Sequence, residues 1–96
     1  MDRLEYIQHI QDKLDVWGQK LSVLQDDTDR SDGNIKEEYQ FIMRELMRNY
    51  EWIESYMDEL EQMMDESFAE EKILINDRID DFEEQLKIAR DNIKDI

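Results

Sequence analysis

The chain has 96 residues, which limits it to one domain with a modest core. It carries 27 Asp and Glu residues against 12 Lys and Arg, giving a net charge of −15, so direct binding to nucleic acid or anionic membrane is not expected. Because the chain contains no cysteine, disulfides and thiol chemistry are excluded.

The first predicted helix covers residues 3–25. Its apolar side chains recur at spacings of three and four residues, which places them on one stripe of a helix. The stripe consists of Ile7, Ile10, Leu14, Trp17, Leu21 and Leu24. Gly18 is expected to cost about 1 kcal/mol relative to alanine, and it either permits a close neighbouring backbone or has no packing role. Because the stripe needs an apolar partner, this segment is predicted to pack against another helix.

Residues 26–34 predict an acidic loop between two helices. Short polar side chains in this segment compete for backbone hydrogen bonds and favour caps and turns, and the Asp-Gly-Asn triplet at 32–34 is the strongest helix breaker in the chain. The spacing of the stripe nevertheless continues through the segment at Leu24, Thr28, Ser31 and Ile35. An unbroken helix through the segment is therefore the alternative.

Two further helices are predicted over residues 35–64 and 68–96. The stripe of the second consists of Ile35, Tyr39, Ile42, Leu46, Ile53, Tyr56 and Leu60. The stripe of the third consists of Ile75, Ile79, Phe82, Leu86, Ala89, Ile93 and Ile96. The phase changes between them, which either a turn at residues 65–67 or a stutter in a continuous helix would explain. Ser67 and Glu70 have the spacing of a capping box at such a turn.

These segments predict an all-α fold in a single domain over residues 1–96. The expected architecture is an antiparallel helical bundle or coiled-coil hairpin with three helices, because the three segments have similar lengths. The alternative has two longer helices, with only one of the two turns present.

Part of the sequence resembles a known family. The residues that carry the resemblance are Leu14-Asp15-Val16-Trp17, Leu21, Leu24, Lys36-Glu37-Glu38-Tyr39-Gln40 and Leu46. Over about residues 6–60 this pattern is similar to a family of small bacterial coiled-coil proteins, some described as stress-response proteins. The resemblance implies a helical hairpin or bundle linked to stress, and it transfers no catalytic residue. The chain departs from the family at residues 26–34, where the family is rich in alanine.

The acidic segment shares some features with a calcium-binding loop, in which carboxylate and carbonyl oxygens hold the hard cation. Asp27, Asp29, Ser31 and Glu38 match the first, third, fifth and twelfth positions of an EF-hand, but Asp32 occupies the sixth position, where glycine is required. A solvated turn is therefore expected, and loose cation binding through Asp27, Asp29 and Asp32 is the lesser alternative. No metal or cofactor is expected.

No catalytic constellation is apparent in the sequence. His9 is the single histidine, and Tyr6 stands three residues before it, where a Glu-x-x-His motif would need an acid. The serines lie in helical or capping contexts, and the Glu and Asp residues supply no acid–base pair, since almost all fall on predicted polar faces. The protein is expected not to be an enzyme.

Methionine and aromatic residues are denser in the second helix than one narrow stripe requires. The residues that widen the stripe are Met43, Met47, Tyr50, Met57 and Met64. A wide stripe is typical of a helix that is flanked by two others. The alternative is an adaptable docking surface for another protein, for which the candidates are Phe41, Trp52, Met43 and Met47.

The sequence therefore predicts a non-enzymatic coiled-coil protein that acts through self-association or protein–protein scaffolding. Its partner is expected to be a protein or a second copy, with no direct contact to nucleic acid or membrane. The alternative is an acidic mimic of nucleic acid that inhibits a basic DNA- or RNA-binding protein, and a weaker one is divalent-cation binding at the acidic loop. A cytoplasmic location is expected, because no leader peptide and no membrane-length apolar run is visible.

Overall fold

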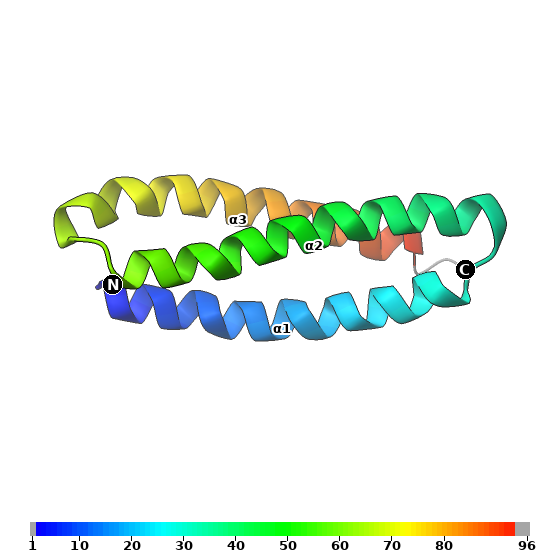
Figure 1. Ribbon diagram of the computed structural model, residues 1–96, viewed down its shortest axis with the longest axis horizontal. Coiled ribbons are helices and arrows are strands. Elements are labelled where there is room, and N and C mark those ends of the chain that lie inside the picture. The colour runs from blue at the N-terminus through cyan, green and yellow to red at the C-terminus, as the bar shows by residue number, and fades with distance from the viewer. Residues whose placement is uncertain (1, 94–96) are drawn as a thin grey trace.

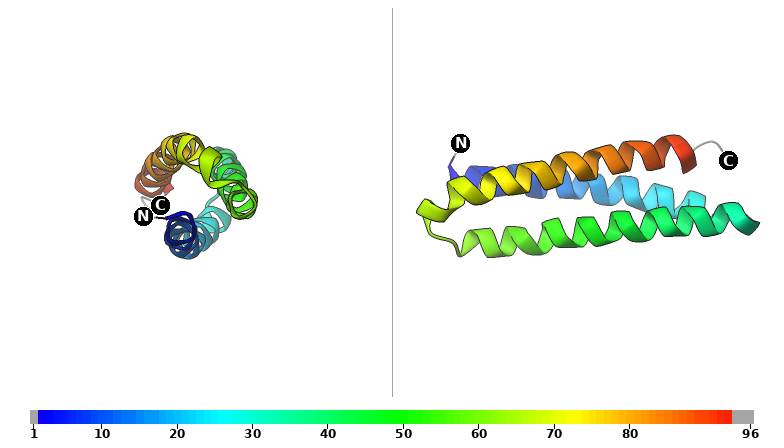
Figure 2. Two further views of the ribbon diagram at one scale, coloured as in Figure 1. Left: turned by 90° about the vertical axis from the view of Figure 1, so that its left-hand side faces the viewer. Right: turned by 90° about the horizontal axis from the view of Figure 1, so that it is seen from above.

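A computed structural model of the protein describes residues 2–93, and within this range it contains three helices. These are α1 (Arg3–Arg30), α2 (Gly33–Glu61) and α3 (Asp65–Ile93). Consecutive helices run in opposite directions and lie side by side in a rod of 50 × 18 × 18 Å (Figure 1, Figure 2). The predicted all-α bundle of three helices is confirmed, and both predicted breaks between helices are present.

The helices pack around one continuous apolar core. Every stripe residue predicted for the first helix is buried, as are those of the third from Ile75 to Ile93; Ile96 lies outside the described residues. At mid-length the rings of Trp17 and Phe82 meet edge to face, with centroids 4.9 Å apart, and this contact joins α1 to α3. Phe82 is fully buried, so it is a central element of the core.

Helix α2 contacts both other helices, and half-buried aromatic residues flank its buried core positions. The Tyr50 hydroxyl donates a hydrogen bond to the Leu14 carbonyl of α1, whereas the Tyr39 hydroxyl donates to the Asn92 carbonyl of α3. The most deeply buried residues of α2 are Met43, Leu46, Ile53, Met57 and Leu60. Helix α2 is therefore flanked by α1 and α3, the arrangement that a wide stripe favours.

The stripe predicted for α2 is partly wrong in its detail. Tyr39, Ile42 and Tyr56 are half-buried flanks, and Ile35 is 53% exposed. Ile35 is exposed because the first turn of α2 projects past the ends of α1 and α3 (Figure 1, Figure 2).

The loop between α1 and α2 is shorter than predicted, because α1 continues to Arg30 and the residues from 26 to 30 are helical. Thr28 lies in the core, where its hydroxyl donates to the Leu24 carbonyl at 2.8 Å. The buried Ser31 then caps the helix, since both its backbone N–H and its hydroxyl donate to the Thr28 carbonyl. Burial of these two side chains outweighs the poor helix propensity of the acidic residues around them.

Gly33 opens α2 with a positive φ of 64°, a conformation that is costly for residues with a Cβ. An added Cβ would have no atom within 4 Å, so strain would come from the backbone alone. We expect Gly33→Ala to lower the free energy of unfolding by about 1 kcal/mol, measured by urea denaturation. Gly33→Asn is the control and should cost less, because asparagine tolerates this conformation better. Equal stability of Gly33→Ala and wild type would contradict this role.

The second turn covers residues 62–64, and α3 begins at Asp65 rather than at residue 68. The Ser67 N–H donates to the Met64 carbonyl, so Ser67 lies inside the first turn of α3 and does not cap it from outside. The Arg3 side chain donates to the Met63 carbonyl and ties the start of α1 to this turn. The phase change in the sequence therefore marks a turn.

Gly18 has a packing role. A Cβ at this position would stand 3.1 Å from the Tyr50 hydroxyl oxygen, so the glycine makes room for a side chain of α2. The close approach considered from the sequence exists, but the neighbouring group is a side chain and not a backbone.

Candidate protein-binding site

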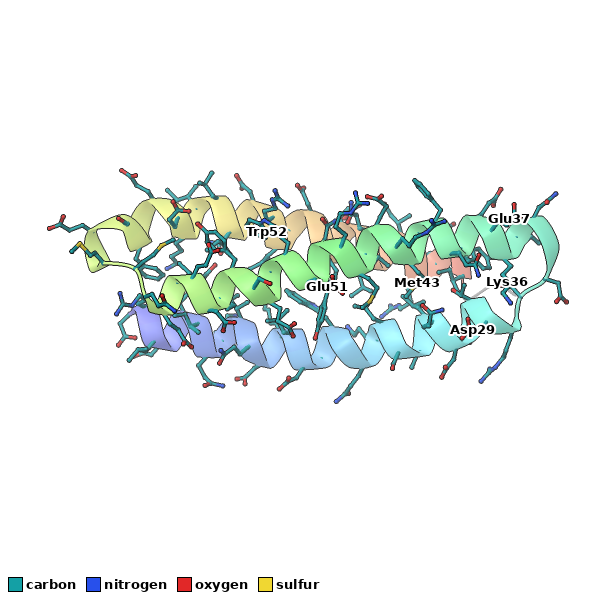
Figure 3. All side chains as sticks on the ribbon, in the orientation of Figure 1. Asp29, Lys36, Glu37, Met43, Glu51 and Trp52 are labelled. Carbon is teal, nitrogen blue, oxygen red and sulfur yellow. The ribbon has the colours of Figure 1, made fainter. Side chains whose placement is uncertain are left out.

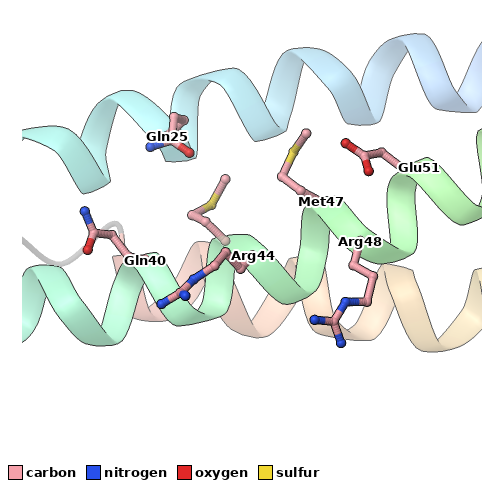
Figure 4. Close-up of a pocket in the computed structure, with 7 residues that line it drawn as sticks. Gln25, Gln40, Arg44, Met47, Arg48 and Glu51 are labelled. Carbon is pink, nitrogen blue, oxygen red and sulfur yellow. The ribbon is translucent and has the colours of Figure 1, made fainter.

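A groove of about 650 Å³ runs between α1 and the outer side of α2, and we call it the α1–α2 groove. Its lining residues are Gln25, Gln40, Met43, Arg44, Met47, Arg48 and Glu51 (Figure 4). Six of them come from successive turns of α2, and Gln25 comes from α1. The groove is therefore a long feature of the α2 surface that α1 closes on one side.

The groove combines an apolar floor with a positively charged edge. Met43 is buried at its base, and Met47 is 36% exposed. Met47 and Glu51 extend toward α1, whereas Arg48 extends away from it (Figure 4). The Arg48 guanidinium lies 3.7 Å from the Glu45 carboxylate on its own helix, in an exposed pair worth little energetically. Arg44 forms no ion pair with the residues that the structure describes, so its charge remains available to a partner.

The four partner-binding candidates from the sequence do not converge on one site. Met43 and Met47 lie together in the α1–α2 groove. Phe41 lies outside the groove on the same helix, with 61% of its side chain exposed. Trp52 is half-buried on the other side of α2, toward α3.

Two other side chains cover the Trp52 ring. The Tyr56 ring stacks on it at a centroid distance of 4.8 Å, and the Arg78 guanidinium lies 4.1 Å from its centroid. The Tyr56 hydroxyl donates to Glu71, and this hydrogen bond, with burial second, raises the pKa of Tyr56 to about 12. Trp52 therefore joins α2 to α3.

Arg44, Arg48 and Gln25 were not predicted as site residues. The two arginines stand four residues apart on α2, so they lie close together on its surface. That spacing, beside Phe41 and Met47, was the sequence feature that could have identified the two arginines. No sequence feature could have identified Gln25, because its place in the groove depends on how α1 packs on α2.

The acidic segment does not assemble its candidate ligands around one point. Ser31 is buried and bonded to Thr28, while the Asp27 carboxylate pairs with Arg30 at 3.7 Å. The Asp29 carboxylate accepts from Gln25, and its carbonyl accepts from Lys36 across the turn (Figure 3). Asp32 and Glu38 are exposed. Among the described residues no group of three His, Cys, Asp or Glu side chains could hold a metal ion.

His9 is exposed at the edge of a groove between α1 and α3. The neighbouring Tyr6 is buried and donates to the Asn76 side-chain oxygen at 2.6 Å. Burial, with the nearby Asp80 charge second, raises the pKa of the Tyr6 hydroxyl to about 12. Tyr6 therefore stays protonated in neutral solution and joins α1 to α3.

Comparison of the chain with models of protein families, with curated proteins and with solved structures finds no match. Within residues 2–93, none of the three helices has a stretch apolar enough to span a membrane.

Proposed function

We propose that this protein is a non-enzymatic helical bundle that acts through self-association or protein–protein scaffolding, with the α1–α2 groove as its contact surface. The resemblance to small bacterial coiled-coil proteins supports extending this proposal to a stress-linked role in the cytoplasm. The supporting observation is a groove with exposed Met47 and two arginines on a bundle in which the apolar stripes of α1 and α3 are already buried. Such a surface has no intramolecular use, and methionine adapts easily to a partner.

Self-association is tested by measuring mass against concentration with size-exclusion chromatography, light scattering and sedimentation. The monomer has a mass of 11.8 kDa, so a second species of twice that mass is expected to grow with concentration. A strict monomer over the whole accessible range would remove self-association from the proposal. Scaffolding would then require a partner whose binding is lost in Met47→Glu, a change that places a charge in the groove.

A second function, mimicry of nucleic acid, is favoured by the shape and charge of the molecule together. The rod is 50 Å long, and a DNA duplex of that length carries about 29 phosphate charges, roughly twice the net charge of this chain. An acidic rod of this kind would compete with DNA for a basic protein. Competition that weakens steeply with added salt supports mimicry, whereas salt-independent binding to basic proteins would contradict it.

A further inference from the structure

We propose that the occupant of the α1–α2 groove is a second copy of this chain, bound so that the two α2 helices run antiparallel about a two-fold axis. This inference deepens the proposed function and rests on it. A two-fold interface brings the same surface of both copies together, so that surface must be complementary to itself. Helix α2 meets this requirement in the distribution of its charges.

The two halves of α2 differ sharply in charge. Residues 33–48 carry three basic and three acidic side chains, whereas residues 49–61 carry five acidic side chains and no basic one. Antiparallel pairing places the arginine-bearing half of each helix against the acidic half of the other. The charge complementarity is thus a property of the helix sequence, and it arises twice in one dimer.

The exposed residues of α2 supply specific pairs in this arrangement. Arg44, Glu51 and Asp58 recur at intervals of seven, which puts them on one stripe of the helix, and Arg48 lies one turn beyond Arg44. With the two-fold axis beside residues 49 and 50, Arg48 of each copy faces Glu51 of the other. Arg44 then lies between Glu51 and Asp58 of the other copy, about 5 Å along the axis from each.

Apolar side chains beside the arginines add apolar surface that the contact would bury. Met47 is 36% exposed over the buried Met43, and Phe41 is 61% exposed one turn before Arg44 and two turns before Arg48. Covering these side chains with a second α2 would remove apolar surface from water at the place where the charges match. The net charge of −15 on each copy opposes association, so the contact depends on these local pairs.

The test is a charge swap, read out by sedimentation equilibrium. Arg44→Glu/Arg48→Glu is expected to weaken the dimer at least about tenfold, because attractive pairs become repulsive. Glu51→Arg/Asp58→Arg is expected to weaken it for the same reason. An equimolar mixture of the two variants should restore a dimer containing one chain of each. The matched control is Lys87→Glu/Arg90→Glu on α3, which changes the net charge by the same amount and should leave the dimer within about threefold of wild type.

The outcomes separate this inference from the proposed function. If the wild type forms a dimer and the α2 and α3 substitutions weaken it equally, the antiparallel α2 contact is overturned while self-association remains in place. A wild-type monomer at every concentration would overturn both. The protein could also be a monomer whose groove residues change their NMR signals only when an acidic amphipathic peptide is added. That result would assign the groove to a different protein and overturn the second copy as its occupant. Circular dichroism of each variant verifies that the bundle is intact.

Discussion

Phe82→Ala is expected to lower the free energy of unfolding by about 3–5 kcal/mol. The Phe82 side chain is fully buried at the middle of the bundle, where its ring contacts Trp17 of α1 and lies 6.4 Å from the ring of Tyr50 of α2. Truncation would leave a cavity bordered by all three helices. A loss of this size is a large fraction of the stability of a typical small domain. Urea unfolding followed by far-ultraviolet circular dichroism measures it.

The same substitution at Phe41 is the matched control. Phe41 is 61% exposed, and Phe41→Ala should change the stability by no more than about 0.5 kcal/mol. Both variants should be measured at low protein concentration, because association would add a concentration-dependent term. Similar losses for the two variants would mean that Phe82 is not at the centre of the core.

The stripes of α1 and α3 could be predicted from spacing, because the apolar residues beside them, such as Val16, Val23 and Ile88, are too few to form a second continuous row. In α2 spacing was insufficient. Ile42 and Met43 are adjacent and both apolar, but Met43 is buried at 3% exposure and Ile42 is a half-buried flank. Which of the two faces the core depends on the positions of α1 and α3, and a single helix does not specify those positions.

The length of the loop between α1 and α2 also could not be predicted without the tertiary structure. Local preferences of the acidic residues favour a loop from residue 26, yet Thr28 and Ser31 continue the stripe and are buried. The groove was predicted in part for a similar reason. Met43 and Met47 were recognisable as surplus apolar residues, whereas Arg44 and Arg48 are indistinguishable from solubilising charges until the neighbouring groove is known.

Raising the pH from 10 to 12 is expected to remove a stabilising contribution of Tyr6. Burial raises the pKa of this hydroxyl from 10.0 to about 12 in the folded protein. Because the folded pKa is the higher one, the contribution is fully present below pH 10 and is lost as the pH rises through 12. Two pKa units correspond to about 2.7 kcal/mol, and Tyr6 is only 4% exposed, so a loss of about 2–3 kcal/mol is expected in urea unfolding.

Two variants separate the effect of Tyr6 from the effects of Tyr50 and Tyr56, whose raised pKa values act in the same direction. Tyr6→Phe keeps the ring but cannot ionise, so its stability should fall less steeply than that of the wild type between pH 10 and 12. Asn76→Ala removes the hydrogen-bond acceptor of Tyr6 and should cost about 1 kcal/mol at neutral pH while keeping the steep fall. Parallel pH profiles for the wild type and Tyr6→Phe would show that the Tyr6 hydroxyl is not held protonated by the α1–α3 contact.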